Sequence, residues 1–502
     1  MTALAGRRGV VLALAALVAA SLSLRAPGLG EPLWVDEGIS IGIASHPLGD
    51  IPGLLRQDGS PPLYYALLHL WMRVFGDGER AVHALSLACA LPAVPLAFWA
   101  GDRLFGRRAA LAAAVLAATN PFLTVYSGEA RMYALVMTLS VAAAGAAALV
   151  AVGGGRRPAC VLGASLAALL WTHAWALFLL AGVGAALAVA AWRRPRDGIA
   201  RPAAVALALA LLAFAAWIPI LVDQARHTGA PWSARPDARA ILDGVWAPLD
   251  GGPGALVVLA AGGLGLAGLL RDGPARERGG AAALATMAGV ALAAAWGVAQ
   301  IEPNWANRYL SVLFGPVLLL AAAGLARLGR AGVAGLAVAA ALPLLLPPGE
   351  RKSTVDLVAA RAAPALRPGD VVVSAQPEQV PVLAYYLPDG LRYRTPMGPV
   401  ADPAVMDWRD VHARLAAAPA AASAAGALAT IDGARRVLFV QPVPRGESWT
   451  RPWPAAVLRA SAAWRRALDG HPRLRPVAAV PAGADARLAV RATLYAIDRA
   501  VR

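Results

Sequence analysis

Residues 31–65 read EPLWVDEGISIGIASHPLGDIPGLLRQDGSPPLYY and follow the first apolar run of the chain. Near their start they hold an adjacent acid pair, Asp36 and Glu37, and they end in a segment rich in Asp, Pro and Tyr. A stretch of this kind beside a membrane segment is typical of catalysis at a membrane surface. The other parts of the chain are therefore interpreted as the frame that holds it.

The composition indicates a protein with many membrane spans. Of the 502 residues, 58% are hydrophobic and 15% are charged, whereas a soluble protein carries about 25% charged residues. The apolar residues come in long runs, which favours many spans over one large core. The net charge of +16 fits basic residues that anchor spans on the cytoplasmic side. No basic face with interleaved aromatic residues occurs, so we expect no nucleic-acid partner.

Several common sites find no support in the sequence. Cys89 and Cys160 lie in or beside apolar runs and have no CxxC or Cys/His pattern, so we expect no disulfide and no structural zinc. Walker, HExxH and GxSxG patterns are also missing. Nucleotide-driven transport and common hydrolase chemistry therefore lack support.

About eleven apolar runs are candidates for membrane spans. They cover residues 10–24, 81–100, 109–125, 134–153, 159–171, 174–192, 203–222, 254–270, 281–300, 309–326 and 331–347. The first run also fits a signal peptide, but the many later runs favour a span. In both cases the residues that follow it lie outside the cytoplasm. The apolar segment 62–75 is too short and interrupted to count.

The distribution of arginine predicts the orientation. With the N-terminus inside, alternate short loops carry clustered arginines at 103–108, 156–157, 193–201, 271–278 and 327–330. The opposite loops are poorer in clustered arginine and include 31–65, 126–133, 222–252 and 302–308, together with His173. The positive-inside rule therefore predicts a multi-pass protein of the cytoplasmic (inner) membrane with all these loops on the outer face.

The sequence changes character after the last apolar run. We expect a transmembrane domain over residues 1–348, with a catalytic first outer loop at 25–80, and a second domain over residues 349–502. Short buried strands are predicted at 370–374 and 436–440, and helices at 409–427 and 455–468. An odd number of spans places this small α/β domain outside the cytoplasm.

The acid pair has two interpretations. Asp36 and Glu37 fit the solvated start of a helix, where acidic residues cap the free N–H groups. They also fit a general base, because burial at a membrane interface raises the pKa of a carboxyl group and lets it accept a proton from a hydroxyl.

Further candidate residues lie in the other outer loops, each with a structural alternative. Glu129 and Arg131 form either a surface pair of little energetic value or a second acid beside a phosphate-binding guanidinium. His173 is either a structural hydrogen-bonding residue or a substrate ligand. Arg308 is either an anchor at a helix end or a phosphate ligand facing the bundle interior.

These segments together resemble a known superfamily. The chain is similar to the polytopic C-type-fold glycosyltransferases that use polyprenyl-phosphate sugars, which include protein O-mannosyltransferases and the aminoarabinose transferase acting on lipid A. The resemblance covers about residues 30–330. It rests on five motifs in order: WVDEG at 34–38, DGSPPLYY at 58–65, YSGEARMY at 126–133, Thr172-His173, and NRYL at 307–310.

The resemblance implies a fold, a reaction and a set of site residues. It implies about eleven transmembrane helices and transfer of a sugar, with inversion, from a polyprenyl-phosphate donor to a glycan, lipid or protein acceptor. Asp36 would be the base, and Glu37 its neighbour for positioning or for a metal. A divalent ion held by Asp36, Glu37 or Glu129 is compatible with the family, and membrane lipids are expected partners. The residues implied to bind substrate are Asp58, Tyr64, Tyr65, Tyr126, Glu129, Arg131, Tyr133, His173 and Arg308.

Two departures and two alternatives accompany this interpretation. Many relatives have a tyrosine after the Thr-His pair, where this chain has Ala174 and Trp175. The C-terminal domain also differs from the sugar-binding repeats of eukaryotic mannosyltransferases. A lipid-linked sugar flippase or transporter and a non-catalytic assembly protein are the competing functions. The polar residues cluster in the outer loops rather than at mid-membrane, which favours the enzyme over a transporter.

Overall fold

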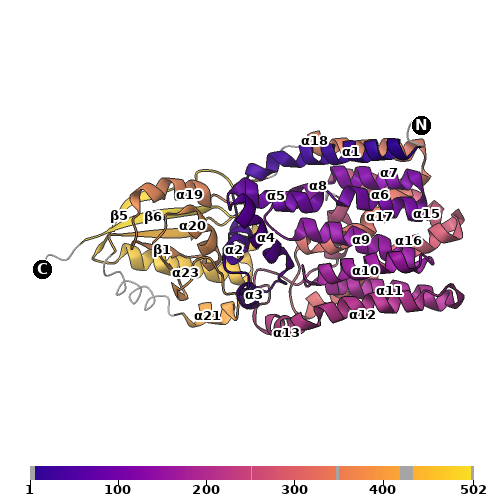
Figure 1. Cartoon of the computed structure of the whole chain (residues 1–502). Helices are drawn as coiled ribbons and strands as arrows, with labels where there is room; N and C mark the ends of the chain where they lie inside the picture. The colour runs from indigo at the N-terminus through magenta and orange to yellow at the C-terminus, as the bar shows by residue number, and fades with distance from the viewer. Residues whose placement is uncertain (1–5, 250–251, 346–349, 419–433, 499–502) are drawn as a thin grey trace.

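The computed structural model describes residues 6–249, 252–345, 350–418 and 434–498. A helical bundle forms one end of the molecule, and a six-stranded sheet with its own helices forms the other (Figure 1). Between them lie α2 (Val35–Ser45), α3 (Ile51–Asp58) and α4 (Leu63–Phe75) (Figure 1). The expected class, a polytopic helical protein with a C-terminal α/β region, is confirmed.

Every predicted apolar run coincides with one or more helices of the bundle in the described part of the chain; residues 346–347 of the last run lie outside it. The bundle helices are α1 (Arg7–Arg25), α5 (Glu79–Ala90), α6 (Ala93–Phe105), α7 (Arg107–Thr119), α8 (Pro121–Ser127), α9 (Tyr133–Ala151), α10 (Arg156–Leu170), α11 (Ala176–Arg193), α12 (Ala200–Phe214), α13 (Ile218–His227), α15 (Pro253–Asp272), α16 (Ala275–Ile301), α17 (Phe314–Arg327) and α18 (Arg330–Leu345). A short helix, α14 (Arg239–Trp246), precedes α15. The pattern of apolar runs therefore located the bundle correctly.

The number of full-length spans is smaller than the number of runs. Among the described residues, eight helical segments are long and apolar enough to cross a membrane. The pair α7–α8, bent by 45°, adds a ninth if it is one span. The other two runs form the shorter helices α10 and α18, and the 15 residues of α10 rise only about 22 Å. The chain is a multi-pass membrane protein, and its described residues hold eight or nine helical segments of full length besides the two shorter apolar helices α10 and α18.

The bend between α7 and α8 has a local cause. Pro121 begins α8 and cannot donate a backbone hydrogen bond, and the side chain of Asn120 accepts one from the backbone N–H of Leu123 at 2.8 Å. Asn120 thus caps a new helix rather than continuing the old one. The break turns residues 126–133 toward α2 at the sheet-facing end of the bundle.

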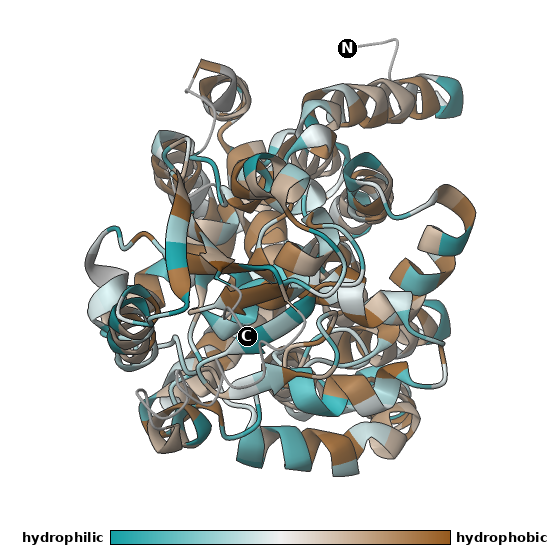
Figure 2. Cartoon of the chain, turned by 90° about the vertical axis from the view of Figure 1, so that its left-hand side faces the viewer, coloured by the Kyte–Doolittle hydropathy of each residue, from teal (hydrophilic) through white to brown (hydrophobic). Residues whose placement is uncertain are grey.

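The sheet has the order β3-β2-β1-β4-β6-β5. Its strands are β1 (Val371–Ser374), β2 (Arg392–Thr395), β3 (Gly398–Val400), β4 (Arg436–Pro442), β5 (Leu474–Val480) and β6 (Val490–Ile497). The central strand β1 pairs in parallel with β2 and β4, and the remaining pairs are antiparallel. Seen from the sheet side, the central strands are mainly hydrophobic (Figure 2). The strands predicted at 370–374 and 436–440 are β1 and β4.

Helices cover the sheet on two faces. Val371 and Val373 of β1 pack in one cluster with Trp464 of α23 (Pro452–Asp469). Val372 points the other way and belongs to the large core that continues into the bundle, as the two-residue period of a strand requires. That face also carries α19 (Val355–Ala362) and α20 (Val380–Tyr386).

The two predicted C-terminal helices have different outcomes. The helix predicted at 455–468 is α23. Of the range 409–427, the structure has α21 (Val411–Ala417). Residues 419–427 lie outside the described residues.

Helix α2 is docked closely against the C-terminal region. A Cβ atom on Gly38 would lie 2.6 Å from Val382 of α20, and one on Gly42 would lie 1.9 Å from the carbonyl oxygen of Ala404. Any larger residue would push these segments apart, because packed backbones cannot absorb such overlaps. The two glycines thus hold the start of α2 beneath the sheet region.

Candidate active site

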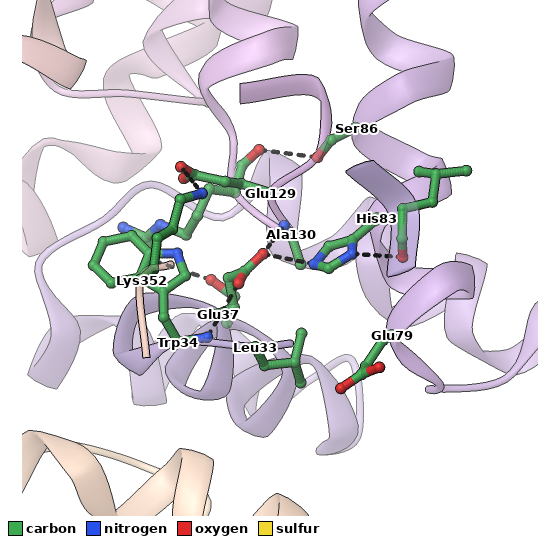
Figure 3. A network of polar contacts seen from close by, with 12 residues as sticks. Leu33, Trp34, Glu37, Glu79, His83, Ser86, Glu129, Ala130 and Lys352 are labelled. Atoms are coloured by element: carbon green, nitrogen blue, oxygen red, sulfur yellow. Dashed lines mark hydrogen bonds and ion pairs between the residues drawn. The ribbon is translucent and has the colours of Figure 1, made fainter. Parts of the chain in front are cut away.

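Glu37 is buried at the start of α2 and joins three segments. Its side chain is 2% exposed. Oε2 accepts a hydrogen bond from the backbone N–H of Trp34 at 3.2 Å, and Oε1 accepts one from the backbone N–H of Ala130 at 2.6 Å (Figure 3). His83 of α5 also places Nε2 2.8 Å from Oε1 (Figure 3). The helix-capping interpretation therefore holds for Glu37, and the same carboxylate fixes the turn that contains residues 129–131.

His83 complements the carboxylate of Glu37 with a positive charge. Its Nδ1 lies 3.0 Å from the carbonyl oxygen of Leu29, while Nε2 faces Glu37. Both ring nitrogens thus face acceptors, which only the doubly protonated imidazolium can satisfy by donating twice. A buried ion pair with such complete hydrogen bonding holds its geometry well. We infer that Glu37 positions its neighbour, because both its oxygens are occupied by donors.

Asp36 points away from this network. Successive residues of a helix are turned by about 100°, so the two acids face different surroundings. Oδ2 of Asp36 lies 3.5 Å from Nη2 of Arg308, and the Asp36 side chain is 17% exposed. No hydrogen bond to Oδ2 is formed within the described residues. Asp36 is thus a partly exposed carboxylate whose buried Oδ2 lies beside the guanidinium of Arg308.

Arg131 supports α2 from the other side. Its Nη1 lies 3.2 Å from the backbone oxygen of Asp36, 3.0 Å from Oγ of Ser40 and 3.4 Å from the hydroxyl of Tyr65. Tyr65 in turn donates to Oδ2 of Asp58 at 3.0 Å. Burial raises the pKa of Asp58, and the charge of Arg131 opposes this shift. The structure thus joins Arg131, Tyr65 and Asp58 in one chain beneath Asp36.

Glu129 is paired with a residue that the sequence interpretation missed. Lys352, which follows the last bundle helix, places Nζ 2.6 Å from Oε1 of Glu129 (Figure 3). The Glu129 side chain is 3% exposed and that of Lys352 is 36% exposed. Burial raises the pKa of Glu129, and the ammonium group of Lys352 opposes this shift.

One signal for Lys352 was available in the sequence. It is the only lysine among 46 basic residues, all the others being arginine. Lysine carries a compact charge on a flexible stem and is not interchangeable with the planar guanidinium of arginine. The ammonium also lies 5.9 Å from the ring of Trp34, so Lys352 contacts two of the predicted motifs.

Aromatic rings form a wall next to these charges. The Tyr133 ring lies 5.1 Å from that of Tyr126 and 5.7 Å from that of His173, and His173 lies 5.1 Å from Tyr309. Nδ1 of His173 accepts a hydrogen bond from the backbone N–H of Trp175 at 3.1 Å. Burial, with the charges of Arg131 and Arg308, lowers the pKa of His173 to about 3. The imidazole is therefore neutral and belongs to the wall.

Arg308 completes the site from η6 (Asn307–Leu313), a 3-10 turn before α17. Its guanidinium lies 6.0 Å from the ring of Trp34 and 5.4 Å from that of Tyr309. Nε has no hydrogen-bond partner among the described residues. A half-buried arginine with an unused buried donor beside a carboxylate is suited to binding an anion.

Tyr64 is set apart from the other predicted site residues. Its hydroxyl is 2.8 Å from Oγ of Ser86, which itself donates to the backbone oxygen of Arg131 at 3.1 Å. Tyr64 is fully buried. It thus supports the turn that carries Arg131 rather than facing Asp36.

The carboxylates Asp36, Glu37 and Glu129 do not fit a metal site. Asp36 is next to Arg308, Glu129 is paired with Lys352, and both oxygens of Glu37 accept N–H donors. No group of three or more His, Cys, Asp or Glu side chains with the spacing for a metal ion occurs in the described part of the chain. Cationic neighbours compete with a divalent ion, so these residues do not fit one, and the chemistry below uses none.

A cavity of about 420 Å³ opens at Asp36 and Arg308. Residues of the C-terminal region form most of its lining, and this region carried no motif in the sequence. The lining residues that bear polar or aromatic groups are Trp34, Asp36, Trp232, Arg308, Glu350, Gln376, Glu378, Trp408, Arg445, Trp449, Arg451, Trp453 and Arg487. The partly exposed carboxylate thus faces a space closed by the sheet region.

Comparison with known proteins identifies the fold. No sequence-family model matches the chain, and no curated protein matches it in sequence. The apo structure of ArnT from Cupriavidus metallidurans matches with a TM-score of 0.61 at 15% identity, over 96% of this chain and 97% of that one. The structure of ArnT bound to undecaprenyl phosphate matches with a TM-score of 0.58 at 14% identity, over 97% and 98%. An oligosaccharyltransferase from Archaeoglobus fulgidus reaches a TM-score of 0.49 at 12% identity, over 85% and 69%.

Proposed function

We propose that this chain, which has the fold of ArnT over nearly its full length, is a membrane glycosyltransferase. It transfers a sugar from a polyprenyl-phosphate donor to an acceptor at the outer face of the cytoplasmic membrane. The observation that carries the proposal is Asp36, a partly exposed carboxylate beside Arg308 at the mouth of a cavity. A base next to an anion-binding guanidinium is what this transfer requires.

The donor fits the arrangement of the bundle. ArnT has been crystallised with undecaprenyl phosphate, and a similar lipid would place its apolar tail along the bundle helices. Its phosphate would then lie at the sheet-facing end, where Arg308 has an unused buried donor. A phosphate there competes with Asp36 for Arg308, so binding of the donor frees the carboxylate to act as a base.

The reaction proceeds as a single displacement. Asp36 accepts the proton of an acceptor hydroxyl, and the hydroxyl oxygen forms a bond to the anomeric carbon of the sugar. The bond between that carbon and the phosphate oxygen breaks, and its electron pair leaves with the polyprenyl phosphate. Arg308 stabilises the charge on this leaving group. Because attack comes from the side opposite the leaving group, the anomeric carbon is inverted.

The orientation follows from the positions of the basic loops. The N-terminus lies at the end of the bundle remote from the sheet (Figure 1), and Arg7 and Arg8 begin α1 there. The positive-inside rule favours this end as the cytoplasmic one. The catalytic loop and residues 349–502 are then extracytoplasmic.

The test is transfer from undecaprenyl-phosphate sugars to envelope material, with purified protein in nanodiscs. We expect Asp36→Asn to lower the rate about 10²–10⁴-fold, the range for loss of a general base. Asp50→Asn is the matched control, because Asp50 is an exposed acid in the same loop whose side chain caps no helix. Equal rates for Asp36→Asn and wild type would refute the base assignment. Movement of donor lipid across vesicles without any transfer would favour the flippase instead.

A further inference from the structure

Tryptophan is concentrated around the cavity at Asp36. Five of the chain's 15 tryptophans line it: Trp34, Trp232, Trp408, Trp449 and Trp453. Trp232 and Trp408 are 4.8 Å apart between ring centroids, and Trp408 and Trp453 are 6.1 Å apart. Trp408 and Trp453 are 5% and 2% exposed, so they hold the half-buried Trp232 in place, and Trp232 offers most of the ring surface to the cavity. The C–H face of a pyranose ring is apolar and packs well on an aromatic ring.

Polar groups accompany this aromatic surface. Oε1 of Glu378 accepts hydrogen bonds from Nε1 of Trp453 at 3.0 Å and from Nε2 of Gln376 at 2.9 Å. Oε2 of Glu378 and Nε1 of Trp34 and Trp232 have no hydrogen-bond partner within the described residues. Buried polar atoms without partners are costly. Ligand hydroxyl groups, which both donate and accept, would satisfy such atoms.

Four arginines and the acid Glu350 are among the charged residues that line the cavity. Of its four arginines, Arg308 is near Asp36 and Arg445 pairs with Asp485. Arg451 and Arg487 form no ion pair with the part of the chain that the structure describes, and both are exposed. Burial raises the pKa of Glu378, which favours its neutral form. An anionic group on the ligand would therefore meet two guanidinium groups that lack acidic partners.

We propose that this cavity, lined by Trp232, Trp408 and Trp453 and edged by Arg451 and Arg487, binds the acceptor, and that the acceptor is a glycan bearing a carboxylate or a phosphate. This rests on the proposed glycosyltransferase function and names the acceptor class for the same site. One sugar ring packs on the tryptophans, its anionic group contacts the arginine rim, and a free hydroxyl faces Asp36.

The experiment measures binding without a donor, so its result does not depend on transfer. Three matched probes are titrated into the full chain in nanodiscs by calorimetry: cellobiose, cellobiouronic acid and cellobiose 6′-phosphate. Inorganic phosphate is the fourth ligand and tests for binding of an anion alone. We expect the two acidic disaccharides to bind at least about fivefold more tightly than cellobiose, with a difference that shrinks as salt is raised.

Two variants separate the parts of the site. Arg451→Gln with Arg487→Gln is expected to remove the preference for the acidic probes and leave cellobiose affinity within twofold. Trp232→Leu, at a half-buried position, is expected to weaken all three disaccharides at least fivefold, with unchanged thermal melting as the check on folding. Preference for the carboxylate or the phosphate probe tells the two anions apart.

Three results would overturn the inference: no tighter binding of the acidic probes, binding of inorganic phosphate as tight as that of the disaccharides, or variants that bind like wild type. If probes bind as expected but no sugar is transferred, the enzyme proposal fails and the glycan site stands. If sugar is transferred but wild type binds the probes no more tightly than the variants do, the acceptor class is wrong and the enzyme proposal stands.

Discussion

Replacing Lys352 with methionine gives the sharpest test of how the C-terminal region is connected to the turn at residues 129–131. The change keeps most of the side-chain volume and removes the ammonium group 2.6 Å from Glu129. Breaking a buried ion pair costs about 3–5 kcal/mol, because the remaining charge stays unpaired, whereas an exposed pair contributes about 0–1 kcal/mol. Since Lys352 is 36% exposed and Glu129 is 3% exposed, we expect an intermediate loss of about 1–3 kcal/mol.

The loss has a defined pH dependence. Burial already raises the pKa of Glu129 in the folded protein, and removal of Lys352 raises it further. The folded state then binds more protons than the unfolded state, so its stability falls as pH rises through this pKa. The deficit of Lys352→Met is therefore largest at alkaline pH and shrinks as the pH falls and Glu129 becomes protonated in the folded protein.

The assay is thermal melting in nanodiscs at several pH values, for wild type and three variants. Lys352→Arg keeps the charge and is expected to melt close to wild type. Glu129→Gln in the Lys352→Met background removes the unpaired carboxylate, and it is expected to recover most of the loss at pH 8.5. The reasoning is refuted if the deficit of Lys352→Met is the same at pH 5.5 and 8.5, or if adding Glu129→Gln recovers nothing.

Three further predictions concern other parts of the site. Arg308→Lys is expected to reduce transfer about 10²-fold, because an ammonium group cannot replace a planar guanidinium toward a phosphate; a rate near wild type would contradict this. Gly42→Ala places a Cβ 1.9 Å from the oxygen of Ala404 and is expected to cost about 1–3 kcal/mol, whereas the control Gly53→Ala, which meets no atom within 4 Å, is expected to change stability by less than about 1 kcal/mol in melting experiments. The pKa of His173 is lowered to about 3 in the folded protein, so below pH 6.5 the unfolded state binds one more proton and stability falls as the pH decreases. From pH 7 to pH 5, His173→Asn is therefore expected to lose less stability than wild type, by up to about 2 kcal/mol. Equal losses would refute the lowered pKa.

Much of the fold could be predicted because it depends on local patterns. Runs of apolar residues encode membrane helices directly, and within the described residues each of the eleven runs coincides with one or more helices. The motifs at 34–38, 58–65, 126–133 and 307–310 all supply residues that meet around α2. In the described part of the chain, eight or nine helical segments of full length and the shorter helices α10 and α18 together correspond to the eleven runs.

The candidate site was less predictable where its contacts join distant residues. Asp36 and Glu37 are chemically alike and adjacent, and no sequence pattern could say which one faces His83 and which one faces Arg308. Tyr64 and Tyr65 are a second such pair, one bonded to Ser86 and the other to Asp58.

The sequence by itself therefore determined a multi-pass helical bundle, a C-terminal α/β region and the motifs gathered at one end, because hydrophobic periodicity and charge are local properties of the chain. Only the tertiary structure decided that Lys352 reaches Glu129, 223 positions earlier, and that tryptophans of the C-terminal region close the cavity above Asp36. These contacts arise from the docking of α2 against the sheet region through Gly38 and Gly42. Such docking depends on the fit of two packed surfaces, which no short stretch of sequence encodes.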